Sequence, residues 1–227
     1  MHRPIYEFPY PPQEIFFSSP PANVSWKEII KPLPEELSGE PDMVETEIIE
    51  SFYQSTLPLV RASGRSLILP VVCDNGVYTF HGFISSIPSS LKKYLVGSNR
   101  AILTVISVGE RLAEERAAYE DTHQTRGYVD LVNVLIAWHL DFLQREFIGQ
   151  CMASKRFHRM TGRPYELNSH NLSPHFFNLL EQGLNLRDYH FGFSEDRVLV
   201  PENCRLFLTA YKSMRKGGNV ELRVVEL

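Results

Sequence analysis

The most regular hydrophobic pattern in the chain lies between Val129 and Ile148, where apolar residues recur with the spacing of an α-helix. Twenty residues in helical conformation extend about 30 Å. The first half of the segment is apolar around nearly its whole circumference, which is typical of a buried helix. We therefore predict a central buried helix. Its broad apolar face is formed by Val132, Leu135, Ile136, Leu140, Leu143 and Phe147.

Two segments before this helix have the composition of buried strands. Leu67–Cys73 is an apolar run interrupted by Pro70, and Ala101–Val108 is rich in β-branched residues. The turn sequence at residues 74–76, Asp-Asn-Gly, joins the first run to Val77–Ile84, whose alternation predicts the second strand of a hairpin.

Capping residues predict several helices. Asp42 followed by Glu45 forms a capping box ahead of a helix over Met43–Gln54, and Ser173 starts a helix that Gly183 ends. The buried face of the first of these helices is predicted to hold Val44, Ile48, Ile49 and Phe52. Shorter helices are predicted over Trp26–Ile30, Pro88–Leu95 and Gly109–Asp121.

The last part of the chain is predicted to alternate between strands and a helix. Strands are expected near Tyr189–Phe193 and Arg197–Val200, followed by a helix from Glu202 to Met214 that Gly217–Gly218 ends. A strand over Asn219–Leu227 closes the chain.

The order of these elements predicts an α+β fold, in which a small, mainly antiparallel sheet packs on the long helix. Proline recurs through residues 1–25 and blocks both helical and ladder hydrogen bonds. Residues 1–40 are therefore predicted as a proline-rich extended arm, and residues 41–227 as a single α+β domain. The arm's aromatic residues could cover apolar patches of that domain or serve as a ligand for a partner's groove.

Charge and composition narrow the classes of function. The net charge is −4, whereas proteins that bind through phosphate contacts usually carry a basic excess, so no nucleic-acid partner is expected. No apolar run reaches the ~18–20 residues of a membrane span, and no transmembrane span is expected. Cys73, Cys151 and Cys204 lack metal-ligand spacing and predict reduced thiols in a cytosolic protein.

No constellation of catalytic residues can be assembled from the sequence. GxSxG, HExxH, CxxC and phosphate-binding glycine loops are all absent. Cys151 and His158 could form a thiol–imidazole pair, but we expect Cys151 to be a buried structural cysteine. His139 is expected to be a hydrogen-bonded histidine in the core or at its boundary. We predict a non-catalytic protein with no cofactor and no metal site.

A Leu-Pro pair at Leu57–Pro58 is the clearest candidate for partner binding. Proline is favoured in the first turn of a helix, and Ser55 or Thr56 could cap that turn. We expect Leu57, Leu59 and Val60 to project an apolar cluster from an exposed helix start. The alternative is an ordinary helix start packed into the core.

Two segments together resemble a known protein family. Ser51–Pro70 (SFYQSTLPLVRASGRSLILP) has a Leu-Pro pair, a short variable run and a closing proline, and Arg156–Leu167 (RFHRMTGRPYEL) combines basic, aromatic, Thr-Gly and proline residues. In this order they resemble the F-box-bearing suppressor of RNA silencing encoded by the first reading frame of poleroviruses and enamoviruses. Where that family usually has Leu or Ile, four residues after the leucine, this chain has Arg61.

The resemblance implies a substrate adaptor in the cytoplasm of an infected plant cell, with endomembrane association left open. In that family the F-box binds the Skp adaptor of a Skp–cullin–F-box ubiquitin ligase, and the protein directs host Argonaute to degradation. Carried over to this chain, the Skp-binding residues are Leu57, Pro58, Leu59, Val60 and Pro70. A target-binding or fold-building motif would include Arg156, Phe157, Thr161, Gly162 and Pro164.

Two other classes of function stay open on the sequence alone. The first is a silencing suppressor that binds RNA directly through the basic residues between Lys155 and Arg163. The second is a non-catalytic viral structural or matrix-like protein that works through its proline-rich arm.

Overall fold

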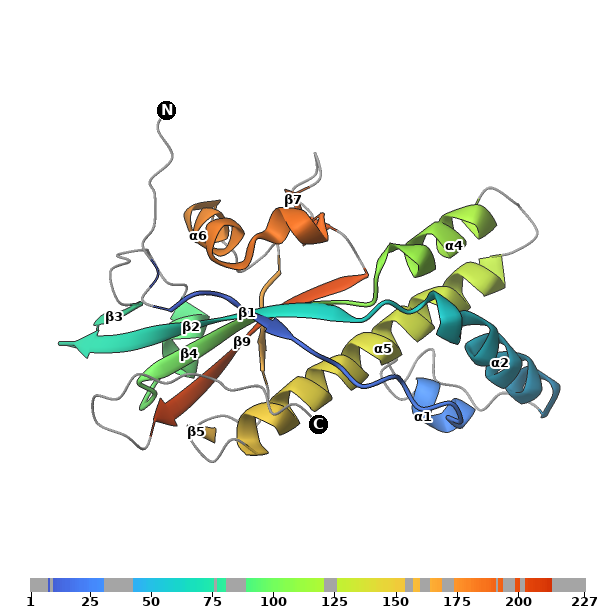
Figure 1. Cartoon of the computed structure of the whole chain (residues 1–227), viewed down its shortest axis with the longest axis horizontal. Coiled ribbons are helices and arrows are strands. Elements are labelled where there is room, and N and C mark those ends of the chain that lie inside the picture. The colour runs from blue at the N-terminus through green and yellow to red at the C-terminus, as the bar shows by residue number, and fades with distance from the viewer. Residues whose placement is uncertain are drawn as a thin grey trace.

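The structure, a computed structural model, describes residues 8, 10–30, 43–75, 77–80, 89–120, 126–153, 157–159, 164–168, 174–190, 192–193, 199–200 and 203–213. Within these ranges the chain forms an antiparallel sheet with the long helix α5 (Arg126–Ala153) packed on it (Figure 1). The α+β fold class expected from the sequence is confirmed.

Three long strands form the centre of the sheet: β2 (Ser63–Asp74), β4 (Arg100–Ser107) and β9 (Cys204–Ser213). Within the described residues the sheet has seven strands, in the order β1-β2-β4-β9-β5 with β3 paired to β2 and β6 paired to β9. The shorter strands are β1 (Gln13–Ile15), β3 (Val77–Phe80), β5 (Phe157–Arg159) and β6 (Tyr165–Glu166), and β7 (Gly192–Phe193) and β8 (Leu199–Val200) pair separately.

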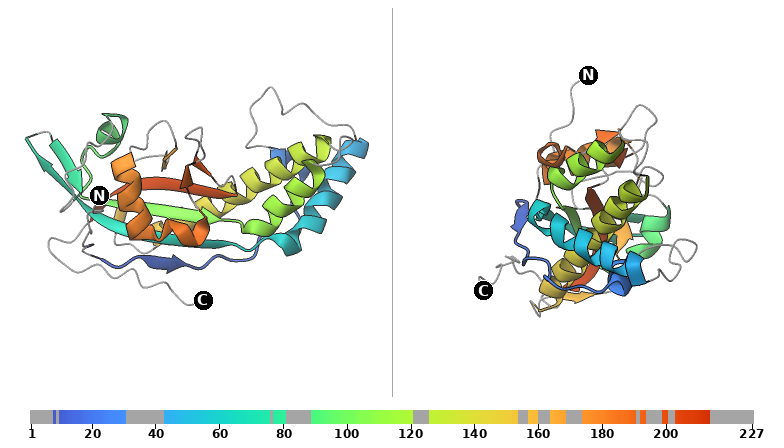
Figure 2. Two further views of the ribbon diagram at one scale, coloured as in Figure 1. Left: turned by 90° about the horizontal axis from the view of Figure 1, so that it is seen from above. Right: turned by 90° about the vertical axis from the view of Figure 1, so that its right-hand side faces the viewer.

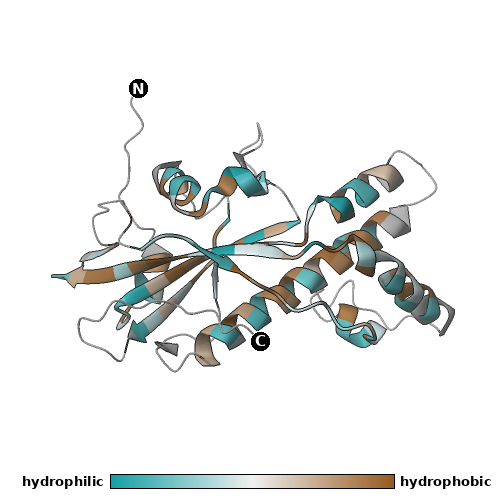
Figure 3. Ribbon diagram, viewed as in Figure 1, coloured by the Kyte–Doolittle hydropathy of each residue, from teal (hydrophilic) through white to brown (hydrophobic). Residues whose placement is uncertain are grey.

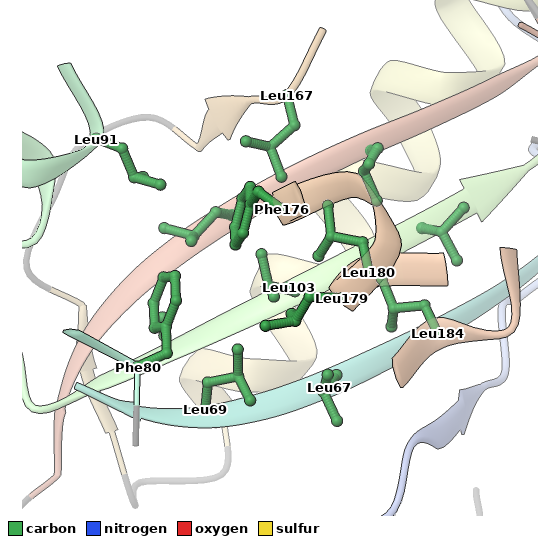
Figure 4. Packing of buried hydrophobic residues seen from close by; sticks show 14 of the residues in the cluster. Leu67, Leu69, Phe80, Leu91, Leu103, Leu167, Phe176, Leu179, Leu180 and Leu184 are labelled. Carbon is green, nitrogen blue, oxygen red and sulfur yellow. The ribbon is translucent and has the colours of Figure 1, made fainter. Parts of the chain in front are cut away.

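Alternate side chains of the long strands enter two different cores, because successive residues of a strand point to opposite faces. Leu67 and Leu69 of β2 belong to the cluster beneath α6 (Pro174–Leu184) and α3 (Ser89–Tyr94), shown in Figure 4. Ile68, between them, belongs to the cluster beneath α5. A sheet covered on both faces explains the nearly continuous apolar runs of its strands.

The helix predicted over Glu202–Met214 is wrong, because this segment contains strand β9. All six residues from Leu206 to Tyr211 are buried. A helix packed on one side would turn some of six consecutive residues to solvent, whereas a strand covered on both faces buries all of them. β9 pairs with β4 along its length, and the pair Ile102↔Thr209 lies in the middle of that ladder.

The other helices lie close to their predicted positions. They are α1 (Trp26–Ile30), α2 (Met43–Thr56), α3 and α4 (Glu110–Glu120), the last of which is largely hydrophilic (Figure 3). The helix was predicted to end at Gly183. Helix α6 instead continues to Leu184, and Asn185 takes the left-handed conformation with φ 55°. A Cβ at Gly183 would lie 2.5 Å from Leu67 Cδ2, so this glycine permits close packing instead of ending the helix.

Helices α1 and α2 with the first part of α5 form one end of the elongated molecule, away from most of the sheet (Figure 2). A separate cluster holds this end together, and its buried members are Val24, Ile29, Tyr53, Leu135 and Trp138. We call this part of the molecule the helical end. No helix of the described residues is both long and apolar enough to cross a membrane.

Residues 10–25 of the N-terminal arm are extended and pack on the rest of the molecule, and helix α1 follows them. Its strand β1 pairs with β2 in the register Gln13↔Ser66. Phe8 and Phe17 pack against the two sheet clusters, whereas Phe16 is 68% exposed. Phe8 and Phe17 therefore fit the first of the two alternatives for the arm, in which its aromatic residues cover apolar patches of the domain. Asp42, Ser173, Gly217–Gly218 and Asn219–Leu227 lie outside the described residues.

Candidate protein-docking site

The Leu-Pro pair lies in a short 3₁₀ turn, η2 (Leu57–Leu59), that continues directly from helix α2. Thr56, the residue before the turn, has helical dihedrals and makes no side-chain capping bond. Its Oγ1 instead donates to the carbonyl of Tyr53 at 2.9 Å. Because α2 runs into the turn without a break, no new helix starts here, and the predicted cap is wrong.

The three residues of this turn and Val60, which follows it, differ in exposure. Pro58 is exposed, and Leu57 and Leu59 are half-buried. Leu57 packs on the cluster of the helical end, Leu59 packs on the cluster beneath α5, and Val60 is a buried member of that second cluster. The predicted exposed apolar cluster is therefore reduced to Pro58 and the outer parts of Leu57 and Leu59.

The closing proline of the motif lies far from the turn. Pro70 is half-buried in β2, opposite Arg100 of β4. It lies seven positions after Ser63, which starts β2, a distance of about 23 Å along an extended chain. The structure therefore does not bring Leu57–Pro58 and Pro70 together into one compact surface.

The outward face of α2 extends the surface around Pro58. Ile48, Ser51, Ser55 and Pro58 are all exposed and recur at helical spacing, about three and seven positions apart. Ile48 is 49% exposed, although the sequence predicted it on the buried face together with Ile49 and Phe52. Both of those residues are indeed half-buried. The regular spacing of Ile48 from the serines and the proline was the signal that could have placed it outside.

The inner side of α2 is tied to the N-terminal arm. The hydroxyl of Tyr53 donates to the carbonyl of Pro21 at 2.7 Å, and the amide of Gln54 donates to the carbonyl of Ala22. Burial, assisted by the carboxylate of Glu28, raises the pKa of Tyr53 to about 12, so this hydroxyl stays a proton donor. These bonds fix the direction in which α2 presents its outer face.

The second motif contributes backbone to the sheet. Phe157 lies in β5, opposite Ser213 of β9, and Pro164 is half-buried just before β6. Arg156, Thr161 and Gly162 lie outside the described residues. The described part of the motif therefore supports the sheet edge beside β9.

Cys151 and His139 are both buried. Burial raises the pKa of the Cys151 thiol to about 12, against a hydrogen bond from Tyr211 that lowers it. His139 is completely buried, neither of its ring nitrogens bonds to a described residue, and burial lowers its pKa to about 4. Among the described residues, the expected hydrogen bond of His139 is thus not formed. Among the described residues, no group of His, Cys, Asp or Glu has the arrangement of a metal site.

Comparison with known proteins identifies the fold but no family. No protein-family model matches the chain, and a search of curated proteins finds no match. Among solved structures, the chain is similar to the MetH reactivation domain, which was determined bound to AdoHcy. The TM-score is 0.55 at 9% sequence identity, over 90% of this chain and 79% of that one. A similarity at this level of identity concerns the arrangement of helices and strands alone.

Proposed function

We propose that this protein is a viral suppressor of host RNA silencing that acts as an F-box-like substrate adaptor. In this proposal it recruits a Skp–cullin–F-box ubiquitin ligase and directs Argonaute to degradation, without catalysing a reaction itself. The observation that carries the proposal is Pro58, exposed on a turn at the end of the outward face of α2.

The geometry favours docking through a helix face and its terminal turn. Partner grooves commonly bind a few apolar anchors presented at helical spacing. Ile48 and Pro58 supply exposed apolar surface at the two ends of such a row, and the small side chains of Ser51 and Ser55 lie between them. A partner could approach this row closely, because no bulky side chain stands in its middle.

The same geometry limits which motif residues can contact a Skp adaptor directly. Val60 supports the turn from inside the core, and Pro70 lies in a strand covered on both faces. We therefore assign contact to Pro58 with the outer parts of Leu57 and Leu59, and add Ile48 to the surface. Val60 and Pro70 keep a positioning role in this proposal.

Pull-down of a purified plant Skp adaptor tests the proposal most directly. Ile48→Asp should weaken binding by about tenfold or more, because it places a charge in an apolar contact. Val96→Asp is the matched control, since Val96 is 60% exposed on the loop after α3, outside the proposed surface. Pro58→Ala should weaken binding as well and leave thermal unfolding unchanged.

The double variant Leu57→Ala/Pro58→Ala should lose binding, by about 2 kcal/mol or thirtyfold for one well-buried anchor. Leu57 also packs on the cluster of the helical end, so thermal unfolding of this variant must be measured alongside. Equal recovery of the adaptor by wild type, Ile48→Asp and Pro58→Ala would disprove the proposed docking surface. Salt-sensitive binding of small duplex RNA below about 1 µM would favour the RNA-binding alternative.

A further inference from the structure

A groove of about 630 Å³ lies between the start of helix α4 and the end of turn η3 (Leu186–Tyr189). Its lining comes from five separate segments: the arm at Phe17–Pro20, the chain at Val60–Ser63, the end of β4 with the start of α4, the end of η3, and Asn203 before β9. Two of the elements that contribute lining residues, α4 and the segment that follows α6, can be followed in Figure 1. The groove is distinct from the outward face of α2.

The floor of the groove is held rigidly by hydrogen bonds around Gly109. Its N–H donates to Ser107 Oγ at 3.0 Å, and its carbonyl accepts from Asn203 Nδ2 at 2.8 Å. Gly109 has φ 88°, and a Cβ there would lie 2.8 Å from Arg61 Cβ, so only glycine fits without strain. The chain's own hydrogen bonds therefore form the floor of the groove without a ligand.

A sheet edge is open beside this groove. β1 pairs with β2 only as far as Ile15↔Gly64. The arm then turns toward α5, where Ser18 donates to Glu146 and the carbonyl of Phe16 accepts from Gln150. The N–H of Arg61 donates to the carbonyl of Val108 on the β4 side at 2.8 Å. Because successive residues of an extended chain point their backbone groups to opposite sides, those of Ala62 point to the side that β1 has left.

The charges of the groove favour an acidic ligand at one position. Asp188 is paired with Arg65 at 3.0 Å, and Glu110 with His190 at 2.6 Å. Arg61 is exposed, and its guanidinium bonds only to the carbonyls of Pro58 and Val60 among the described residues. Arg61 is therefore the cation of the groove without a carboxylate partner in the described part of the chain.

We propose that this groove binds an extended peptide segment of a protein partner with an acidic side chain placed on Arg61. The peptide adds to the sheet at Ala62 by main-chain hydrogen bonds, as in other cases of strand addition. The carboxylate forms a charge-assisted pair with the guanidinium. Small apolar side chains of the peptide lie against Phe17 of the arm and Ala113 of α4, which both line the groove. This inference does not depend on the proposed function.

Fluorescence anisotropy with the full chain tests the proposal. The probe is a labelled octapeptide with Glu at alternate positions between Val and Ala, which can extend as a strand. Two control peptides replace Glu by Lys, or replace alternate residues by Pro to remove main-chain donors. We expect saturable binding of the acidic peptide alone.

Two pairs of variants locate the site. Arg61→Gln should weaken binding about tenfold, whereas Arg145→Gln should not; Arg145 is likewise exposed and bonds to a backbone carbonyl, that of Asp141. Ala113→Phe should abolish binding by filling the groove. Ala118→Phe is its control, since Ala118 is exposed on the same helix and does not line the groove.

Several results would overturn the proposal. They are the absence of saturable binding up to about 1 mM, equal binding of the Lys or Pro peptide, and equal effects of Arg61→Gln and Arg145→Gln. Equal displacement of the peptide by single-stranded RNA would assign the groove to nucleic acid instead. If Ala113→Phe does not fold, the arginine pair alone decides, because neither arginine contributes to the buried clusters.

Discussion

The body of the molecule and its helical end are held together in different ways. Among the described residues, the two faces of the sheet carry clusters of 20 and 16 buried apolar residues, whereas the cluster of the helical end has five. The helical end also buries His139 without a hydrogen bond. Burial of apolar surface is the main favourable term in folding, so the body should be the more stable part.

Turn η2 lies where these two regions meet. Leu57 packs on the cluster of the helical end, and Leu59 packs on the cluster beneath α5. In the proposed function, binding of a partner at this turn would be coupled to how firmly the helical end sits on the body. The proposed docking surface would then belong to the helical end, whereas most of the buried apolar residues belong to the body.

The largest expected effect comes from the body. Leu103→Ala, at the centre of β4, should destabilise the whole protein by about 3–5 kcal/mol, because Leu103 is completely buried within the cluster beneath α6. Ile29→Ala, equally buried but in α1, should cost about 2 kcal/mol and mainly open the helical end.

Urea unfolding and hydrogen exchange distinguish these outcomes. For Leu103→Ala, exchange should accelerate mainly in β4, because α2 exchanges through opening of the less stable helical end. For Ile29→Ala, the amides of α1 and α2 should exchange faster, while those of β4 change little. Equal acceleration in both regions for both variants would show that body and helical end unfold as one unit.

The body was also the part that the sequence predicted best. Every residue of Ala101–Val108 is buried, and Val129–Ile148 buries one broad apolar face, so local pattern and tertiary packing agree. At β9 they disagree, because six consecutive buried residues reflect a sheet covered on two faces, which is a property of other segments of the chain. The helix predicted over Glu202–Met214 is wrong for this reason.

The candidate site was less predictable because it depends on how α2 is rotated. Ile48 points outward and Val60 points inward, and each is decided by contacts with distant parts of the chain. The bonds of Tyr53 and Gln54 to the arm set that rotation, and the partners in the arm are backbone carbonyls. Every residue type has a carbonyl, so nothing in the sequence marks these partners.

An intermediate effect should come from His139 in the helical end. Burial lowers its pKa from 6.5 to about 4, so between these pH values the unfolded chain binds a proton that the folded protein does not. The stability that the protein has with a neutral His139 is therefore complete above pH 6.5, and it is lost as the pH falls toward 4. At pH 5 the loss amounts to about 2 kcal/mol relative to neutral pH.

His139→Leu tests this contribution by urea unfolding at pH 7 and pH 5. The variant should be more stable at both values, because it removes two buried nitrogens without partners. Its advantage over the wild type should be larger at pH 5 by about 2 kcal/mol. A constant difference between the two proteins across this range would contradict the burial of a neutral His139.

The smallest expected effect concerns the arm, which Arg65 of β2 ties to the body. Its guanidinium pairs with Glu14 of β1 at 2.6 Å and with Asp188 of η3 at 3.0 Å. Both carboxylates are more than half exposed, so Arg65→Met should cost only about 1 kcal/mol in global stability. Methionine keeps the apolar part of the side chain in place.

The local consequence of Arg65→Met should be larger than the global one. β1 has three residues and few other ties to the body, so limited proteolysis of the arm should become several-fold faster while thermal unfolding changes little. Arg187→Met is the matched control, since Arg187 pairs with Glu181 at 3.1 Å between α6 and η3 and does not contact the arm. Equal proteolysis of the two variants would show that β1 is held by its ladder and its aromatic residues alone.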